Sequence, residues 1–384
     1  MTTGDHEEHD PDAYRLRAYQ SGDDEAVVAL HNRVWDGDRT VAWFRWKYVD
    51  GPYRDEVPVY LVTRDERVVG MIGFVPFRMR AGGETGLGLL GGDLVVAPEH
   101  RSRGLFRRFL GPVVGEVPAD GGDGPHRSAP SLPGQADFAF AYANSLSHPG
   151  MLTLGWTDAG PRRTYHRVQD PSRFVRDRLG PRVAGALAPV ARVGARSWLR
   201  LRERGRQRPT DVSVAFHDDP PVETLAALAA EHPPETVHPV HDETFYEWRF
   251  SGPTWSPDGA YVAHRDGEPI AAVLVREERD ERLDATRVSL IHTVPLAGRE
   301  REPGLAAILD RVAADRRDAT SLRAWNPVFP DRLLRERGFL PDDRPPLSWT
   351  GDPDLRLVVY SRSRPPFDES ALRASGDTLW SLDK

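Results

Sequence analysis

The chain has 384 residues, a formal net charge of −7 at pH 7 and no cysteine. This length predicts two domains, because single hydrophobic cores stop growing at about 250–300 residues. Without cysteine there are no disulfides, thiolate metal sites or cysteine nucleophiles, which agrees with a cytoplasmic location. The acidic balance argues against a nucleic-acid partner, and no stretch reaches the ~18 consecutive apolar residues that a membrane span requires.

The first predicted domain covers residues 13–170, after an acidic tail over residues 1–12 that predicts disorder rather than a signal peptide. A strand leads into a helix whose start, Ser21-x-x-Asp24, resembles a capping box. A short helix with Trp46 and a hairpin follow, and the apolar spacing then predicts a helix behind a loop. The expected strands cover residues 14–19, 57–64, 67–77, 89–96 and 138–143, and the expected helices cover residues 23–34 and 104–116.

Four features of this domain recur in the same order in the second half of the chain. They are Trp46-Lys47-Tyr48 with Trp248-Arg249-Phe250, the hairpin at residues 57–77 with residues 259–276, Arg101-x-x-Gly104-Leu105 with Arg301-x-x-Gly304-Leu305, and Asn144 before Gly155-Trp156 with Asn326 before Gly338-Phe339. Strands and helices in this order predict an α/β protein with an α+β mixed sheet, parallel near the loop. The second domain is expected over residues 211–384.

Two segments lie outside the repeat. Residues 118–135 are rich in glycine, proline, aspartate and serine and predict a mobile loop. Residues 171–210 form a basic linker that is dense in arginine and contains an amphipathic run over residues 183–201. This linker fits an interdomain helix whose apolar stripe packs on the domains, and it also fits a helix that lies on an anionic membrane.

The loop at residues 101–106 has the composition of a phosphate-binding loop. Such a loop needs a glycine where the chain turns and a helix start behind it, whose N–H groups are unpaired. Gly104 meets the first need, and Arg101 and Arg103 add positive charge. The helix dipole contributes only about 0.3–1 kcal/mol, so charge-assisted hydrogen bonds of about 1.5–3 kcal/mol each dominate such binding. Neither a Walker nor a dinucleotide pattern is present, and an ordinary strand-to-helix turn with surface arginines has the same composition.

The strand before the loop, Pro98-Glu99-His100, the loop with its helix, and Asn144 before Gly155-Trp156 resemble the GNAT superfamily of N-acetyltransferases. The resemblance covers residues 14–167 well and residues 212–361 more weakly. It implies acetyl-CoA or another acyl-CoA as co-substrate, with the loop on the pyrophosphate and the preceding strand along the pantetheine arm. The residues that inherit these contacts are Leu94, Val95, Val96, Arg101, Ser102, Arg103, Gly104, Leu105, Phe106, Arg107 and Asn144. Phe106 departs from the pattern of the family, which more often has a small residue there.

A tandem pair of such domains resembles the larger GNAT enzymes, which include mycothiol synthase and the Fem aminoacyl-transferases. In the second copy Pro303 removes an N–H donor from the loop, and Glu300 and Glu302 flank Arg301. We therefore expect the first domain to bind the cofactor. The second domain is expected to be a degenerate copy that shapes the acceptor site.

Acyl transfer to an amine requires a neutral amine, a donor for the oxyanion and a proton for the leaving thiolate. The resemblance places the oxyanion donor at the backbone N–H near Val96. The tyrosine acid of many family members is missing, because Met151 stands at its position and Leu334 stands there in the second copy. Asp93 and His148 are the candidates for proton transfer; their plain alternatives are a structural or surface carboxylate and an exposed loop histidine.

No metal site is expected, since His238, His241 and Asp242 fit a solvated loop better, and Trp46 and Trp248 fit packing anchors. The leading hypothesis is N-acyl transfer from acyl-CoA to an amine of a small molecule or a protein. A non-catalytic acyl-CoA sensor and a Fem-like transferase that uses aminoacyl-tRNA are the alternatives. The sequence leaves open whether the chain forms a homo-oligomer.

Overall fold

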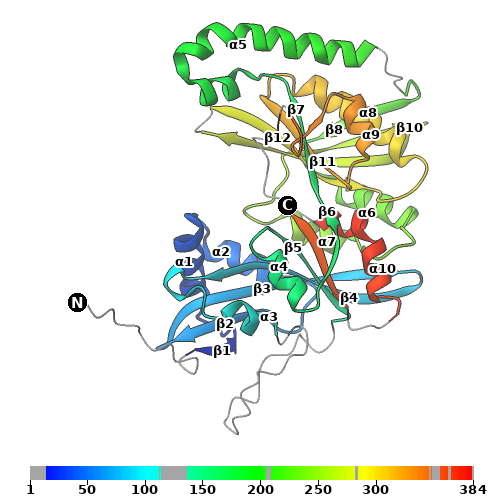
Figure 1. Ribbon diagram of the computed structural model, residues 1–384. Coiled ribbons are helices and arrows are strands. Elements are labelled where there is room, and N and C mark those ends of the chain that lie inside the picture. Colours follow the sequence, from blue (N-terminus) through cyan, green and yellow to red (C-terminus); the bar gives the residue numbers. More distant parts are fainter. Residues whose placement is uncertain are drawn as a thin grey trace. The chain divides into compact units, whose positions relative to one another are not determined.

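A computed structural model describes residues 14–111, 113, 136–204, 209–281, 284–345, 347, 355–361 and 365–382 (Figure 1). The predicted tail and the predicted loop at residues 118–135 lie outside these residues. The chain divides into two compact units. The first comprises Met1–Arg78, Gly86–Thr157 and Val358–Arg364, and the second comprises Met79–Thr85, Asp158–Leu357 and Pro365–Lys384.

The first sheet has the strand order β1-β2-β3-β4-β5-β15-β6, with β9 paired to β3. Its strands are β1 (Arg15–Ala18), β2 (Val59–Arg64), β3 (Arg67–Ala81), β4 (Glu84–Val96), β5 (Phe138–Ala143), β6 (Thr157–Pro161), β9 (His238–Pro239) and β15 (Arg356–Ser361). The helices of this part are α1 (Asp24–Trp35), α2 (Val41–Phe44), a π-helical turn at Arg45–Val49, a short 3-10 turn at Pro98–His100, α3 (Leu105–Leu110) and α4 (His148–Thr153).

The second sheet has the strand order β14-β7-β13-β12-β11-β10-β8. Its strands are β7 (Arg163–Val168), β8 (Val212–His217), β10 (Gly259–Arg265), β11 (Glu268–Asp280), β12 (Ala285–Val294), β13 (Ser321–Asn326) and β14 (Leu340–Pro341). The helices are α5 (Ser172–Arg204), α6 (Val222–Glu231), α7 (Glu243–Phe250), α8 (Arg301–Asp315), α9 (Asp331–Glu336), α10 (Glu369–Ala374) and α11 (Gly376–Leu379). Among the described residues, no helix combines the length and the apolar character that crossing a membrane requires.

The two sheets repeat one topology. Read from β1 and from β8, each sheet has an edge strand, an antiparallel hairpin and a third antiparallel strand, followed by one parallel neighbour. The next place in each sheet is filled from the other half of the sequence, by β15 in the first sheet and by β7 in the second. The mixed α/β class expected from the sequence is confirmed. The domain boundaries expected from the sequence, residues 13–170 and 211–384, follow the order of the repeats. The strands of the two sheets do not follow these boundaries, because β15 lies in the first sheet and β7 lies in the second.

Two local expectations need correction. The helix behind the loop was expected over residues 104–116, but α3 starts at Leu105 and ends at Leu110, and most of the remaining range lies outside the described residues. The solvated loop expected around His238 and His241 is wrong, because both side chains are buried. His241 packs against Phe245 and His292, with ring centroids 4.5 and 4.8 Å apart.

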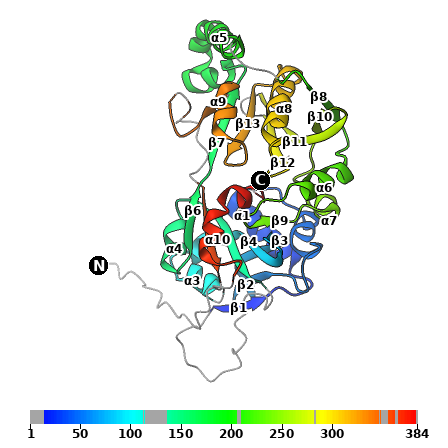
Figure 2. The same ribbon diagram turned by 90° about the vertical axis from the view of Figure 1, so that its right-hand side faces the viewer.

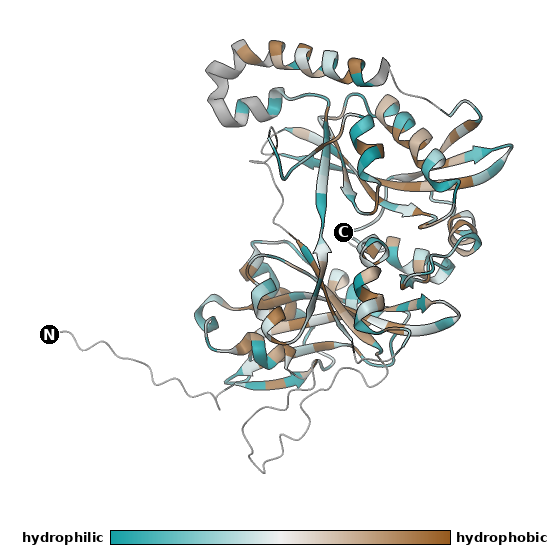
Figure 3. Ribbon diagram, turned by 45° about the vertical axis from the view of Figure 1, so that its right-hand side comes forward, coloured by the Kyte–Doolittle hydropathy of each residue, from teal (hydrophilic) through white to brown (hydrophobic). Residues whose placement is uncertain are grey.

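Apolar residues of β3, β4 and β5 form the core that positions the site. Leu89, Phe74 and Ala139 are fully buried, and α3 adds Leu105 and Phe109 to the same cluster. Figures 2 and 3 show these strands and helices from two further sides. Figure 3 colours hydrophobic residues brown. The burial of α3 against this core fixes where the loop before it can lie.

Gly73 on β3 has no room for a side chain, because a Cβ there would lie 2.3 Å from the ring of Tyr48. Gly73→Ala therefore overpacks this contact and should lower the free energy of unfolding by about 1–3 kcal/mol, measured by urea denaturation. Gly83→Ala is the matched control, since no atom lies within 4 Å of its Cβ position, and a change within about 0.5 kcal/mol is expected there. Equal effects of the two substitutions would contradict the close contact.

Candidate functional site

The first unit has a gap in its sheet where β4 and β5 separate. These parallel strands pair from Gly88 with Phe138 to Gly91 with Ala141, yet β4 continues to Val96. Asp93 lies just beyond the last pair and has a left-handed backbone, with φ 48°. Beyond the last pair, the backbone N–H and C=O groups of β4 do not pair with β5.

The loop follows directly from the end of β4. Ser102 and Gly104 have left-handed φ values of 60° and 73°, and Gly104 is the N-cap of α3. No atom lies within 4 Å of a Cβ position on Gly104. The side chain of Arg101 is exposed and donates from Nε to the carbonyl of Val96 at 3.2 Å. The loop thus has the turn, the open approach and the helix start that a phosphate site needs.

The surroundings of the loop are positively charged. Burial lowers the pKa of His100, and the nearby guanidinium groups of Arg64, Arg103 and Arg33 lower it further, against the opposing effect of Glu99. His100 is therefore neutral at pH 7, and its Nδ1 lies 2.9 Å from the hydroxyl of Tyr14. An electropositive field of this kind attracts an anion such as a pyrophosphate.

Phe106 fits because a glycine faces it. A Cβ on Gly150 of α4 would lie 2.7 Å from the Phe106 ring, and this ring packs against the core cluster of the unit. The departure from the small residue of the family pattern is therefore accommodated within the first unit. α3 and α4 pack together through this contact.

The other predicted residues occupy distinct positions around the gap. Leu94 and Val96 pack against the cluster that contains α3, whereas Val95 is buried. Asn144 Oδ1 accepts hydrogen bonds from the backbone N–H groups of Leu146 and Ser147 at 3.0 and 3.1 Å. Asn144 thus shapes the turn that leads into α4.

His148 is half-buried at the first residue of α4. Met151, three residues further along, belongs to the buried core cluster. The position of the missing tyrosine acid is therefore an apolar packing position in this chain, and it offers no proton donor.

Asp93 is held by side chains that the sequence pattern identified only as part of a repeat, not as part of the site. Lys47 Nζ and the Tyr48 hydroxyl lie 2.5 and 2.6 Å from Asp93 Oδ2. His31 Nε2 lies 3.9 Å from Asp93 Oδ1, and the Lys47 ammonium lies 5.4 Å from the centroid of the Trp43 ring. The π-helical turn of Arg45–Val49 brings Lys47 and Tyr48 to this place.

Asp93 Oδ2 accepts hydrogen bonds from both the Lys47 ammonium and the Tyr48 hydroxyl. Burial and the neighbouring Asp93 charge raise the pKa of Tyr48 well above its usual value, so the phenol stays protonated and donates. Lys47 and Asp93 side chains are only 4% and 11% exposed. One sequence signal pointed here, since Lys47 and Lys384 are the only lysines among 51 basic residues.

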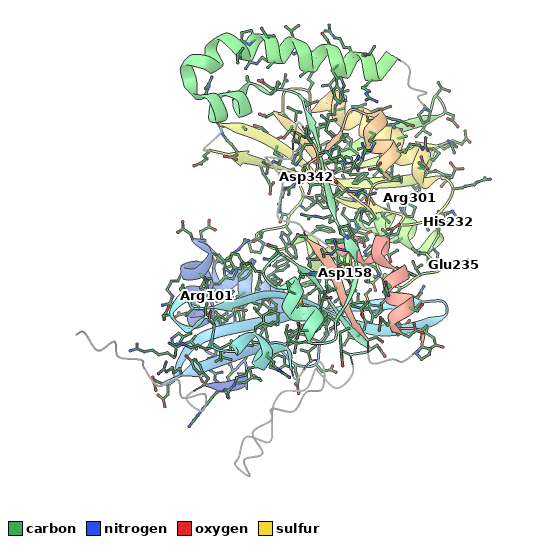
Figure 4. All side chains as sticks on the ribbon, in the orientation of Figure 1. Arg101, Asp158, His232, Glu235, Arg301 and Asp342 are labelled. Atoms are coloured by element: carbon green, nitrogen blue, oxygen red, sulfur yellow. The ribbon has the colours of Figure 1, made fainter. Side chains whose placement is uncertain are left out.

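The second unit lacks the corresponding loop. α8 starts at Arg301, so residues 301–304 form its first turn, and Gly304 packs against Ala271 instead of turning the chain. Arg301 donates to the carbonyl groups of Pro295 and Val328, and burial lowers its pKa to about 10. Figure 4 labels Arg101 and Arg301, which have the same place in the repeat but different surroundings.

The counterpart of Lys47 in the repeat is Arg249. It stacks on Trp255 at 3.7 Å and donates to the carbonyl of Leu382 at 2.8 Å. Arg249 and His292 line the same small pocket, and burial lowers the pKa of His292 to about 3, so this imidazole is neutral. The second copy therefore has an arginine stacked on a tryptophan where the first copy has Lys47, and a neutral histidine lies beside it.

The buried pair of Lys47 and Asp93 should be strongly coupled. Lys47→Met or Asp93→Asn alone leaves one buried charge without its partner and should lower the free energy of unfolding by about 3–5 kcal/mol. The double variant removes both charges, so its loss should be smaller than the sum, with a coupling energy of about 1–3 kcal/mol. The exposed pair of Arg311 and Asp315 is the control, with about 0.3–0.5 kcal/mol expected. Additive losses at Lys47 and Asp93 would overturn this account.

Residues 15–123 match the family model described as an acetyltransferase (GNAT) domain. No curated protein matches the sequence. Among solved structures, a GCN5-related N-acetyltransferase from Anabaena variabilis ATCC 29413 has a TM-score of 0.57 at 10% identity, over 90% of this chain and 72% of that one. A probable N-acyltransferase from Enterococcus faecalis V583 has a TM-score of 0.56 at 9% identity, over 91% and 72%.

A third similar structure is the N-myristoyltransferase of Saccharomyces cerevisiae with bound myristoyl-CoA, with a TM-score of 0.55 at 14% identity, over 91% of this chain and 79% of that one. At these identities the likeness concerns the fold, while the family model matches the segment that contains β4 and the loop. Residues 15–123 of this chain therefore match the acetyltransferase (GNAT) domain family.

Proposed function

We propose that the first unit transfers an acyl group from acyl-CoA, with acetyl-CoA as the donor, to an amine of a small molecule or a protein. The observation that carries this proposal is the separation of β4 from β5 directly before a loop with an open, left-handed Gly104. An extended thioester ligand needs both features, because its arm requires free strand edges and its pyrophosphate requires N–H donors.

In this proposal the loop binds the pyrophosphate. The N–H groups of the first residues of a helix have no carbonyl partner four residues earlier in that helix. In α3 the Arg107 N–H bonds to the Gly104 carbonyl at 3.1 Å, so this role is assigned to the N–H groups before it. Hydrogen bonds to a charged phosphate contribute about 1.5–3 kcal/mol each. The side chains nearest to this role are the arginines of the loop and its helix, whereas Leu105 and Phe106 pack inward. The residues assigned to the pyrophosphate are Arg101, Ser102, Arg103, Gly104, Leu105, Phe106 and Arg107.

The pantetheine arm is assigned to the gap, along Leu94, Val95 and Val96, with Asn144 on the facing side. The thioester carbonyl then lies near the backbone N–H of Val96, which stabilises the oxyanion as the amine nitrogen attacks the carbonyl carbon. The C–N bond forms, the C–S bond breaks, and the proton of the amine leaves while the thiolate receives one. These proposed steps do not require a metal.

The proton-transfer step is assigned to Asp93 and His148. Asp93 is assigned as a base that acts on the amine through water, because it lies on β4 just beyond the last pair with β5. His148 lies at the start of α4, beside the Asn144 turn, and an imidazole suits either proton uptake or proton delivery. Asparagine is close in size to aspartate, and glutamine is close in size to histidine. Asp93→Asn and His148→Gln therefore test proton transfer with little change in packing.

The loop assignment predicts a ligand effect on stability. Acetyl-CoA at 100 times its dissociation constant should stabilise the wild-type protein by about 2.7 kcal/mol, observed as a rise in Tm in a thermal-shift titration. Gly104→Asp should abolish this shift, because its carboxylate repels the pyrophosphate. Gly104→Asn is the matched control, since asparagine has the same shape, tolerates the left-handed φ and carries no charge.

The asparagine variant should keep most of the shift with acetyl-CoA. Longer donors, including myristoyl-CoA, are titrated in the same way to determine the preferred acyl length. No shift with any acyl-CoA in the wild-type protein would refute the proposed function.

Turnover can be followed by thiol release, because the protein has no cysteine to contribute background. With a panel of amines, Asp93→Asn and His148→Gln should each lower kcat by about 10²–10⁴-fold if the residue transfers a proton. Rates are normalised to the folded fraction, since Asp93→Asn also breaks a buried ion pair. Unchanged rates in both variants would rule out these two residues, and acyl-CoA binding without thiol release for any amine would favour a sensor.

A further inference from the structure

The helix α5 presents an exposed apolar stripe on the second unit. Four of the large hydrophobic side chains that are exposed in the described part of the chain lie on it. They are Leu187, Val190, Val193 and Leu201, with exposed fractions of 44%, 69%, 65% and 68%. At 3.6 residues per turn they lie within an arc of about 120°. Exposed side chains of this size gathered on one helix face mark an interaction surface.

The opposite side of α5 fixes the helix to the second unit. Leu199 is buried and packs against Gly338, where a Cβ would lie 2.7 Å from its side chain. Arg192 forms an ion pair with Asp170 at 2.9 Å. Figures 1 and 2 both show α5 (green) on the outer side of this unit. The apolar stripe is therefore not the face that anchors the helix.

The charge of α5 is opposite to that of the whole chain. The helix contains nine arginines and two acidic residues, Asp177 and Glu203, which gives a formal charge of +7, whereas the chain carries −7. Arg196 and Arg200 are exposed on one flank of the stripe, and Arg202, which stacks on Trp198 at 5.5 Å, lies on the other. Figure 3 shows brown and teal residues alternating along this part of α5.

We propose that this face of α5 binds an anionic lipid surface. An apolar stripe flanked by arginines fits the boundary between acyl chains and headgroups, where the stripe is buried and the guanidinium groups meet phosphates. Pairing of α5 with a second copy of itself is disfavoured, since it would bring Arg196 and Arg200 of both chains together. The proposal is independent of the acyl-transfer site, because every residue it uses belongs to the second unit.

The test is sedimentation of the full-length protein with vesicles. Phosphatidylcholine vesicles are compared with vesicles that also contain phosphatidylglycerol. The protein should sediment with the anionic vesicles and not with the neutral ones, and added salt should release it, because surface charges are screened over about 8 Å at physiological ionic strength. Absence of wild-type binding to anionic vesicles would overturn the proposal.

Two sets of variants separate the contributions. Arg196→Gln with Arg200→Gln should weaken binding about 25-fold, at about fivefold for each arginine near an anionic surface. Val190→Ser, Val193→Ser and Leu201→Ser together should weaken it at least as much, because serine cannot replace the buried apolar area. Arg299→Gln and Leu146→Ser are the matched controls, with exposed fractions of 93% and 90% in the wild type, and should bind like the wild type.

Circular dichroism and the Tm should be unchanged in every variant, because all the substituted side chains are exposed. Equal binding of the control and α5 variants would overturn the proposal. A concentration-dependent dimer that is lost in the serine variant, without vesicle binding in the wild type, would assign the stripe to self-association and would also overturn it.

Discussion

The parting of β4 from β5 is the constraint on which the candidate site depends. The backbone N–H and C=O groups at the end of β4 can remain unpaired with β5 only if contacts other than those with β5 hold this part of β4 in place. Two sets of contacts do so in the first unit. On one face Leu94 and Val96 pack against the cluster that includes α3, and Asp93, with its left-handed backbone, is held by Lys47 and Tyr48. The loop then begins where β4 ends, so its position follows from the same contacts.

The two units differ at the position of this loop. Both have a parallel pair beside the central hairpin, from Arg287 with Ser321 onward in the second sheet. Gly104 turns the chain with a left-handed backbone, whereas Gly304 is a helical residue packed on Ala271. Arg101 is exposed at its loop, while Arg301 donates hydrogen bonds to two backbone carbonyl groups. The second unit therefore keeps the topology and uses its loop residues for packing.

The helix α5 is unusual in this chain because large apolar side chains on one of its faces are exposed. A helix of a globular protein normally buries its apolar stripe, yet here Leu199 is buried and Val190 is exposed. The two open interpretations of the basic linker are thus not exclusive, since one side of the helix packs on the second unit and another side carries the exposed stripe. The arginines make that second side suited to an anionic surface.

The sequence by itself determined the repeated order of elements, the mixed α/β class, the place of the loop and the glycine within it. These features depend on local patterns, namely alternation, helical spacing and residues that favour a turn. It also indicated the loss of the loop in the second copy through Pro303, although the burial of Arg301 was not foreseen.

Only the tertiary structure decided which distant residues meet. The partners of Asp93 precede it by 46 and 45 residues, and the exchange of β7 and β15 joins strands from different halves of the chain. His238 and His241 looked solvated because they lie among polar neighbours, but they are buried by other elements. Periodicity indicates which face of a helix or strand is apolar. Which other element covers that face depends on how the whole chain packs.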